Sequence, residues 1–334
     1  MPSALIIGHT GQDGRILWGQ LAQRGFTLIG VSSRETRFGD ALRCAPAVDI
    51  ADYAQVHNLL REHCPDQIYY LAACHQSSQE AEPDQLLAWR ESWSVHVNSF
   101  LNVLQAAHQT GQKMRIFYAS SSRVFGPAIT PEQDESTALK PACAYGVTKA
   151  SAMHLANQFR TSHGMHVSCG IMFNHESPLR GSRFVSQRVV EGLVSIRSGS
   201  STQLKLGNLN ARVDWGYAPD YTRAMQLMLE SGEPLDYVVA TGETHSVREL
   251  VQVAADHLGM SWKNCVVETS DILTRPAQGL CGNAALLKRI TGWKPDVSFP
   301  QMIRIMVDAA VDRHRACPGH RRAVSPILRS NTKP

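Results

Sequence analysis

The apolar residues of this chain alternate between short continuous runs and runs with helical spacing. Residues 4–7 are a continuous apolar run, and Ile16, Leu17 and Leu21 follow at the spacing of an amphipathic helix that ends at Gly25. This alternation continues, with strands predicted at 27–31, 67–72, 114–120 and 236–240 and helices at 54–63, 94–110, 144–160, 221–230 and 247–258. Glycines placed as C-terminal caps support three of the helix ends, at Gly25, Gly111 and Gly164. Strands alternating with helices predict an α/β fold whose parallel sheet carries helices on both faces.

The loop after the first predicted strand is rich in glycine. Gly8, Gly11 and Gly14 occupy the first, fourth and seventh positions of GHTGQDG, directly before the first helix. Glycines at these positions let the backbone turn tightly and bring the helix N-terminus, with its free amides, against a pyrophosphate. The sequence therefore predicts a dinucleotide-binding site on a Rossmann-type doubly wound sheet. The predicted cofactor contacts in this loop are Gly8, Thr10, Gly11, Gln12, Asp13 and Gly14.

The ends of the next strands predict the rest of the cofactor site. After the second strand, where a site for NAD places an acidic residue, the chain has Ser33, Arg34 and Arg37, whose hydroxyl and cationic groups suit a 2′-phosphate. NADP is therefore favoured over NAD. We expect a third strand that closes at Asp49 and Ile50, near the adenine. The strand after it contributes, at its carboxyl end, Leu71, Ala72 and Ala73.

Tyr145 and Lys149 lie one turn apart on one face of the helix predicted at 144–160. An ammonium group beside a phenol stabilises the phenolate and lowers the pKa of the phenol from about 10, which makes tyrosine a usable general base. A serine of the cluster after the strand at 114–120 would hold a substrate hydroxyl while the phenolate takes its proton. These residues predict a proton-transfer site at the carboxyl end of the sheet.

Composition and charge exclude several classes of protein. No apolar run in the 334 residues approaches the roughly 20 residues of a membrane span, so we expect a cytoplasmic protein without membrane partners. The eight cysteines show no CxxC spacing, which indicates neither a disulfide framework nor a metal site. The net charge of +4 is concentrated in a basic C-terminal tail, 311–334, and the slightly acidic remainder argues against nucleic-acid binding.

Six runs of sequence carry a family resemblance. They are GHTGQDG at Gly8, YGVTK at Tyr145, FNHESPLRG at Phe173, LGNLNARVDWGYAPDY at Leu206, ATGETHSVREL at Ala240 and TGWKP at Thr291. Over nearly the whole chain, to about Ala310, the sequence resembles extended short-chain dehydrogenases and, among them, the GDP-mannose 4,6-dehydratases. In that family, NADP oxidises C4 of the mannosyl ring, water is eliminated across C5 and C6, and the hydride returns to C6.

The resemblance implies roles for individual residues. Tyr145 is implied to be the base for the C4 hydroxyl, and Lys149 its electrostatic partner and nicotinamide-ribose ligand. Ser121 is implied to bind the hydroxyl, where the dehydratases usually have threonine. The chain departs from the family at Arg123, which stands where the family has the glutamate that removes the C5 proton. Guanidinium cannot take that proton near neutral pH, and His75, at a neighbouring strand end, is the best candidate to replace it.

Polar and cationic residues after Met172 predict a substrate pocket over the strand ends. The predicted substrate contacts are Ser122, Asn174, Glu176, Ser177, Arg183, Arg188, Arg212 and Arg275, of which Asn174 is also predicted to contact the cofactor. His175 is expected to be a packed, hydrogen-bonded residue without a catalytic role. Two departures from the family lie where the nucleotide would be bound, at Val213 in place of an arginine and at Gln278 in a segment without the family's glutamate.

The pattern also predicts how the chain is divided. We expect an NADP-binding domain made of 1–171 and 207–245, and a smaller, interleaved α/β substrate domain made of 172–206 and 246–310. The helix at 247–258 and residues 275–294 are assigned to the smaller domain. We further expect a homodimer or a homotetramer.

Three functions remain open from the sequence. The leading prediction is an NADP-dependent lyase of the GDP-mannose 4,6-dehydratase type, which forms GDP-4-keto-6-deoxymannose in deoxysugar biosynthesis. The first alternative is a GDP-sugar 4-reductase or 4-epimerase, in which Arg123 stabilises an oxyanion at C4 or holds an acidic group of the substrate. The second alternative is a protein that senses the NADP redox state without turnover.

Overall fold

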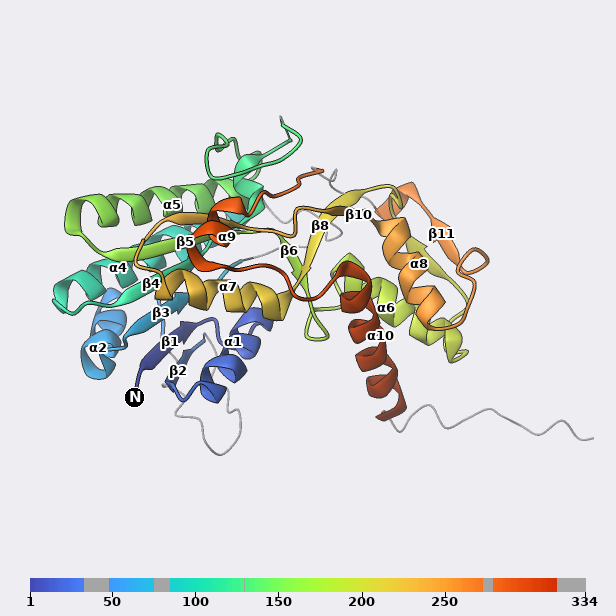
Figure 1. Ribbon diagram of the computed structural model, residues 1–334, viewed down its shortest axis with the longest axis horizontal. Coiled ribbons are helices and arrows are strands. Elements are labelled where there is room, and N and C mark those ends of the chain that lie inside the picture. The colour runs from blue at the N-terminus through green and yellow to red at the C-terminus, as the bar shows by residue number, and fades with distance from the viewer. Residues whose placement is uncertain (33–47, 75–84, 129, 273–278, 317–334) are drawn as a thin grey trace, which may run out of the picture.

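The larger of two lobes is built on a six-stranded parallel sheet (Figure 1). The computed structural model describes residues 1–32, 48–74, 85–128, 130–272 and 279–316. The strand order is β2-β1-β3-β4-β5-β9, and every neighbouring pair is parallel. The strands are β1 (Ser3–Ile7), β2 (Thr27–Val31), β3 (Gln67–Tyr70), β4 (Arg115–Ala119), β5 (His166–Met172) and β9 (Asp236–Val239). The order changes direction between β1 and β3, which is where ligands bind in sheets of this kind.

Helices cover both faces of this sheet (Figure 1). On one face, α2 (Tyr53–His63) contacts α4 (Ser99–Gln109), which contacts α5 (Ala144–His163). On the other face, α1 (Gln12–Gln23) contacts α7 (Ala218–Glu230). Because both faces are covered, strand residues such as Leu5 and Ile6 are almost fully buried, as their continuous apolar runs predict. The predicted doubly wound parallel sheet is confirmed.

The smaller lobe has its own apolar core. Three helices, α6 (Val185–Arg197), α8 (Val247–His257) and α10 (Phe299–Ala316), contact one another around it. A three-stranded sheet of order β10-β8-β6 and a parallel pair, β11-β7, complete this lobe. These strands are β6 (Asn174–Glu176), β7 (Leu204–Leu206), β8 (Arg212–Tyr217), β10 (Thr244–Ser246) and β11 (Val266–Glu268). The chain crosses between the lobes several times, so the predicted interleaving is present.

The remaining elements are short or lie next to longer helices. They are α3 (Gln85–Trp93), the π-helical η1 (Ser94–Asn98) that leads into α4, the 3₁₀ segments η2 (Ser122–Phe125) and η3 (Ser270–Ile272), and α9 (Ala285–Thr291). The predicted helix at 94–110 therefore begins as a π-helical turn. Gly25, Gly111 and Gly164 have positive φ angles of 79°, 69° and 62°, and their prediction as helix ends is confirmed.

Two sequence-based assignments differ from the structure. Asp49 and Ile50 do not close a strand, because the Asp49 carboxylate accepts a hydrogen bond from Ala51 N (2.9 Å) and forms a turn that leads into α2. In addition, α9 was expected in the smaller domain, but Leu287 and Trp293 pack into the core of the larger lobe. The cause is geometric, since α9 contacts β9 and α7.

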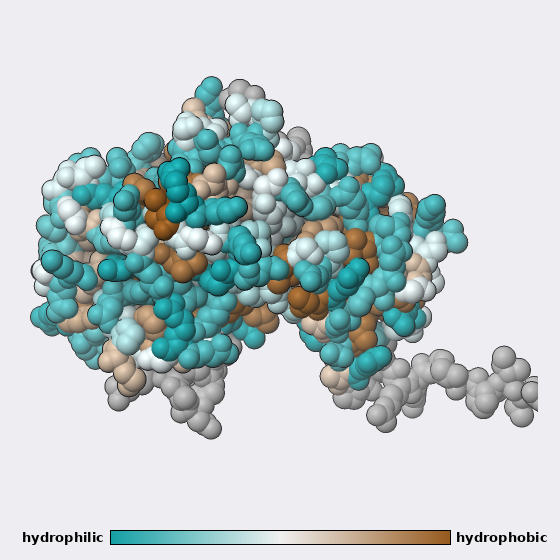
Figure 2. Space-filling model, in the orientation of Figure 1, coloured by the Kyte–Doolittle hydropathy of each residue, from teal (hydrophilic) through white to brown (hydrophobic). Residues whose placement is uncertain are grey.

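The surface of this face is mostly hydrophilic. Figure 2 shows teal residues over both lobes, with apolar residues in separate small patches and a notch between the lobes. Among the described helices, none combines the length and the apolar character that a membrane span requires.

Candidate active site

The glycine-rich loop forms an open anion site at the N-terminus of α1. Gly11 precedes the helix, and among the described residues no side chain caps its first amides. Gly8 has a φ of +93°, and a Cβ there would lie 3.0 Å from Ala72 N. A Cβ at Gly14 would overlap the Gly8 carbonyl, so both positions require glycine. Uncapped amides and a helix dipole suit a phosphate group, so this loop fits the pyrophosphate of a dinucleotide.

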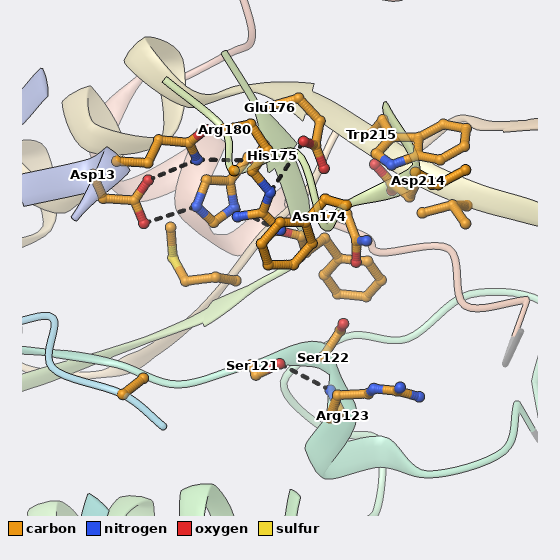
Figure 3. A pocket seen from close by; sticks show the side chains of 18 of the residues that line it. Asp13, Ser121, Ser122, Arg123, Asn174, His175, Glu176, Arg180, Asp214 and Trp215 are labelled. Atoms are coloured by element: carbon orange, nitrogen blue, oxygen red, sulfur yellow. Dashed lines mark hydrogen bonds and ion pairs between the residues drawn. The ribbon is translucent and has the colours of Figure 1, made fainter. Parts of the chain in front are cut away.

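The side chains of Gln12 and Asp13 tie this loop to the start of β6. Gln12 donates to the His175 carbonyl (3.1 Å) and accepts from Ser177 Oγ (2.9 Å). Asp13 Oδ2 lies 2.9 Å from His175 Nε2 (Figure 3). Both side chains face the pocket but bond to the protein itself. They therefore position the cofactor loop against the substrate segment.

The Asp13–His175 pair is charged. His175 Nδ1 lies 2.7 Å from the Phe173 carbonyl and Nε2 faces a carboxylate, so both ring nitrogens donate and the imidazole is cationic. Burial opposes the charge on His175, but the attraction and hydrogen bond of Asp13 outweigh it and raise the pKa of His175. Burial likewise opposes the charge on Asp13, but His175 holds the pKa of this carboxyl below its usual value. The expectation of a packed, hydrogen-bonded His175 agrees with this geometry.

Tyr145 and Lys149 lie one turn apart near the start of α5, with Ser121 opposite them. Cys143 caps this helix, since its Sγ accepts from Gly146 N (3.4 Å). Lys149 Nζ donates to the Ala119 carbonyl (2.7 Å) and lies 5.7 Å from the centre of the Tyr145 ring. Tyr145 shares a hydrogen bond with Ser121, and both line the pocket. The three predicted catalytic residues are therefore brought together.

Burial dominates the electrostatics of this trio. It raises the pKa of Tyr145 to about 12, although the Ser121 hydrogen bond and the charges of Arg180 and Arg123 act in the opposite direction. It also lowers the pKa of Lys149 to about 7. The groups that lower the pKa of Tyr145 here are thus Ser121 and two arginines. Activation of the phenol by Lys149 stays a prediction.

Three carboxylates line the described part of the pocket, and each is already bonded to the protein. They are Asp13, Glu176 and Asp214. Glu176 accepts from Ser186 Oγ (2.6 Å) and pairs with Arg180 Nε (3.1 Å). Asp214 accepts from Thr241 Oγ1 (2.6 Å), and burial raises its pKa. These carboxylates hold the pocket wall together.

Arg123 lies on the opposite wall, next to the two serines. Figure 3 shows Ser121, Ser122 and Arg123 on one side of the pocket and Asn174, Glu176 and Asp214 on the other. The Arg123 backbone N–H donates to Ser121 Oγ (3.3 Å), which caps η2. The described residues offer its guanidinium neither a hydrogen bond nor an ion pair. A cation thus lies at the reactive end of the pocket.

Further arginines line the pocket. Arg180, Arg183 and Arg212 line a cavity of about 510 Å³ together with residues of β8. The Arg180 guanidinium lies 3.5 Å from the centre of the Phe184 ring. Arg212 Nε donates to Thr244 Oγ1 (3.1 Å), and its side chain is half exposed. This charge suits a diphosphate, and the volume falls in the range of small-molecule sites.

The structure gathers most of the predicted site residues in one place. Those that line the pocket are Gly8, Gly11, Gln12, Asp13, Gly14, Leu71, Ala73, Ser121, Ser122, Arg123, Tyr145, Lys149, Asn174, Glu176, Arg183 and Arg212. Six predicted residues do not line it, namely Thr10, Ala72, Asp49, Ile50, Ser177 and Arg188. The predictions for Ser33, Arg34, Arg37, His75 and Arg275 lie outside the described residues.

Two residues of the site were missed from the sequence. Arg180 lies in the FNHESPLRG run, between residues that were predicted to bind substrate, and its position among them was an available signal. His96 is fully buried against Tyr145, with ring centres 5.1 Å apart. His96 precedes the buried Phe100 by four residues, so the two lie on the same helix face. A polar residue on this apolar face was the available signal in the sequence.

Comparison with known proteins gives a consistent family. The family model described as GDP-mannose 4,6 dehydratase matches residues 5–306. The chain is similar to GDP-mannose 4,6 dehydratase 2 of Arabidopsis thaliana, with 35% identity over 91% of this chain and 86% of that protein. It is similar to the GDP-mannose 4,6 dehydratase of Homo sapiens, with 33% identity over 94% of this chain and 93% of that one.

Solved structures agree at the level of the fold. The structure of RMD from Pseudomonas aeruginosa complexed with NADPH has a TM-score of 0.80 at 22% identity and covers 94% of this chain and 100% of that one. Thermus thermophilus UDP-glucose 4-epimerase in complex with NAD has a TM-score of 0.77 at 22% identity and covers 92% of this chain and 98% of that one. From the family model and the curated relatives, the chain belongs to the GDP-mannose 4,6-dehydratase family.

Proposed function

We propose that this protein is a nicotinamide-dependent enzyme that modifies a GDP-hexose at C4, of the GDP-mannose 4,6-dehydratase type. The observation that carries the proposal is the Ser121–Tyr145–Lys149 arrangement, which faces a pocket lined by the N-terminus of α1 and by several arginines. Family membership supports the GDP-hexose. The product would be GDP-4-keto-6-deoxymannose.

Each residue of the proposed site would have its own role in the reaction. Tyr145 would take the proton of the C4 hydroxyl, which Ser121 would hold through its own hydroxyl. Lys149, buried and bonded to the Ala119 carbonyl, would place positive charge beside the phenolate as it forms. Arg180 and Arg212 would hold the diphosphate. The bound cofactor would accept a hydride and return it.

We propose NADP as the cofactor, on the basis of Arg34 and Arg37. The chemical support is the fit of guanidinium groups to a 2′-phosphate. Calorimetric titration of NADP and NAD tests it, and equal or reversed affinities would refute it. A homodimer or homotetramer and a cytoplasmic location are also proposed, to be tested by sedimentation and cell fractionation.

A second candidate function is a GDP-sugar 4-reductase or 4-epimerase. It is favoured by Arg123 and by the three pocket carboxylates, which are already bonded within the described part of the protein. Elimination of water requires a second group that can take the C5 proton, and guanidinium cannot do so near neutral pH. Oxidation or reduction at C4 requires, besides the hydride chemistry that a nicotinamide cofactor would supply, one proton-transfer group, for which we propose Tyr145. His75 is the candidate base if dehydration takes place.

Incubation with GDP-mannose and NADP in deuterated water distinguishes the two functions. A product lighter by one water, with deuterium at C5, supports the dehydratase. Unchanged GDP-mannose, together with reduction of a 4-keto-6-deoxy sugar by NADPH, refutes it and supports the reductase. Tyr145→Phe is the matched control, because it removes the proton acceptor and leaves the rest of the pocket in place. Ranking GDP, UDP, CDP and ADP by thermal shift tests the base, and a clear preference for UDP would refute the GDP-sugar assignment.

A further inference from the structure

His96 is a fully buried histidine that contacts both halves of the proposed active site. Its Nε2 accepts a hydrogen bond from the backbone N–H of Cys74 (3.0 Å), in the segment that follows β3. Its Nδ1 lies 2.8 Å from Thr148 Oγ1, between the catalytic Tyr145 and Lys149 on α5. The ring meets the Tyr145 ring edge-on, at 87°. One side chain thus joins the strand end on the cofactor side to the catalytic helix.

The two hydrogen bonds fix the protonation of the imidazole. Because Nε2 accepts from an N–H group, it carries no proton, and Nδ1 carries the proton and donates to Thr148 Oγ1. The Thr148 hydroxyl in turn donates to the carbonyl of Ala144 or Tyr145, each 3.0 Å away. The chain of bonds therefore runs from Cys74 through the imidazole to the backbone of the catalytic tyrosine.

His96 reaches this position because it lies in the π-helical segment η1. A π-helical turn is wider than an α-helical one, and such turns recur at functional sites. The carbonyls of this segment receive bonds from neighbouring elements: Tyr118 Oη donates to the His96 carbonyl (3.2 Å), Tyr70 Oη to the Val95 carbonyl, and Ser99 Oγ to the Ser94 carbonyl (2.8 Å). Three side chains thus stabilise an otherwise unfavourable turn that places His96 beside Tyr145.

We propose that His96 is a positioning residue with two separable effects, an inference that rests on the proposed function. Through Thr148 and the edge-on ring contact, it fixes the Tyr145 phenol relative to the substrate and so affects kcat. Through Cys74 N, it fixes the strand end on which Ala73 lines the pocket, and so affects cofactor affinity.

Two conservative variants separate these effects. In His96→Gln the side-chain oxygen can take the place of Nε2, which keeps the bond from Cys74 N and loses the donor to Thr148. In His96→Asn the amide nitrogen can take the place of Nδ1, which keeps the donor to Thr148 and loses the acceptor for Cys74. We expect His96→Gln to lower kcat by about tenfold to a hundredfold with cofactor Kd within about twofold. We expect His96→Asn to raise cofactor Kd by about three- to tenfold with a smaller effect on kcat.

Two further variants complete the design. Thr148→Val, which removes the hydroxyl at nearly constant shape, should reproduce His96→Gln. His108→Asn, on the exposed side of α4, is the control and should change neither parameter. Equal losses of kcat and cofactor affinity in the Gln and Asn variants, in proportion to their loss of thermal stability, would overturn the proposal and leave His96 a core residue.

A readout without turnover keeps this test separate from the proposed function. Tyrosine labelled with ¹³C at Cζ gives one resonance for each of the eight tyrosines, and Tyr145→Phe identifies that of Tyr145. We expect His96→Gln and Thr148→Val to shift or broaden this resonance, while His108→Asn leaves it unchanged. If the wild-type protein turns over no GDP-hexose but the resonance responds, the proposed function fails and the positioning role stands. An unchanged resonance in both variants would overturn the positioning role.

Discussion

Replacing Asp13 by asparagine tests the charged bond between the cofactor loop and β6. The Asp13 and His175 side chains are 24% and 11% exposed, so water screens the pair only partly. Breaking a buried ion pair by removing one partner costs about 3–5 kcal/mol, and the partial exposure of Asp13 reduces the expected loss to just below this range, about 2–3 kcal/mol. In Asp13→Asn, no carboxylate would stabilise the imidazolium of His175, so His175 would become neutral.

The pH dependence follows from the direction of the two pKa shifts. The pKa of His175 is raised by Asp13, so its contribution is complete below its unfolded pKa of about 6.5 and is lost as pH rises through the higher folded value. The pKa of Asp13 is lowered by His175, so its contribution is complete above about 3.9 and is lost as pH falls through the lower folded value. The pair should therefore stabilise the protein most between about pH 4 and 6.5.

Urea unfolding of both proteins from pH 5 to 9 measures this effect. We expect the difference in the free energy of unfolding to be largest at pH 5–6 and to narrow as His175 loses its proton in the wild type. Asp256→Asn, an exposed carboxylate on α8, is the control and should cost little at any pH. A loss below about 1 kcal/mol, or a difference that stays constant with pH, would show that the pair is not charged.

Three further predictions follow from single contacts. Tyr145→Phe should lower turnover by about 10²- to 10⁴-fold and leave cofactor affinity unchanged, and residual turnover near the wild-type level would remove Tyr145 as the base. Gly126→Ala should destabilise the protein by more than about 2 kcal/mol, because Gly126 has a φ of +70° and a Cβ would overlap the Lys140 carbonyl. The control is Gly199→Ala, at a φ of +77° with open space around it, and thermal unfolding of both variants should show a smaller loss of stability for this control. Ser246→Ala should cost about 1 kcal/mol, because it removes the cap of α8, in which Ser246 accepts from Glu249 N (3.1 Å), and an unchanged melting temperature would contradict this.

The strands and helices of the larger lobe could be predicted because each shows a recognisable pattern of residues in its own stretch of sequence. A strand buried on both faces shows a continuous apolar run, and a helix ended by glycine at positive φ shows that glycine in the sequence. The Tyr145–Lys149 pair was visible for the same reason, since helical spacing alone places both on one face. The strand predicted to close at Asp49 and Ile50 was wrong, because an aspartate that accepts a hydrogen bond from the residue two positions ahead forms a turn, which competes with a strand.

The partners of polar residues could not be predicted in this way. Asp13 and His175 are 162 positions apart, and nothing in either neighbourhood shows that they pair. The π-helical turn at His96 depends on hydroxyls supplied by Tyr70 and Tyr118, from two different strands. Such features arise only when the whole chain has folded, because their stability comes from tertiary contacts.

The hydrogen bonds and ion pairs of the pocket side chains bear on which of them could transfer a proton to or from a substrate. The carboxylates of Asp13, Glu176 and Asp214 are bonded to protein groups, and His175 lowers the pKa of Asp13, which makes this carboxylate a weaker proton acceptor. Tyr145 is different, since it bonds to Ser121 at the edge of the cavity and can exchange its proton with a bound hydroxyl. In the proposed mechanism, proton transfer at C4 depends on Tyr145, and Arg123 would add positive charge where an oxyanion at C4 would form. Dehydration would also need a base for the C5 proton, for which we propose His75, outside the described residues, so solvent deuterium at C5 is the decisive measurement.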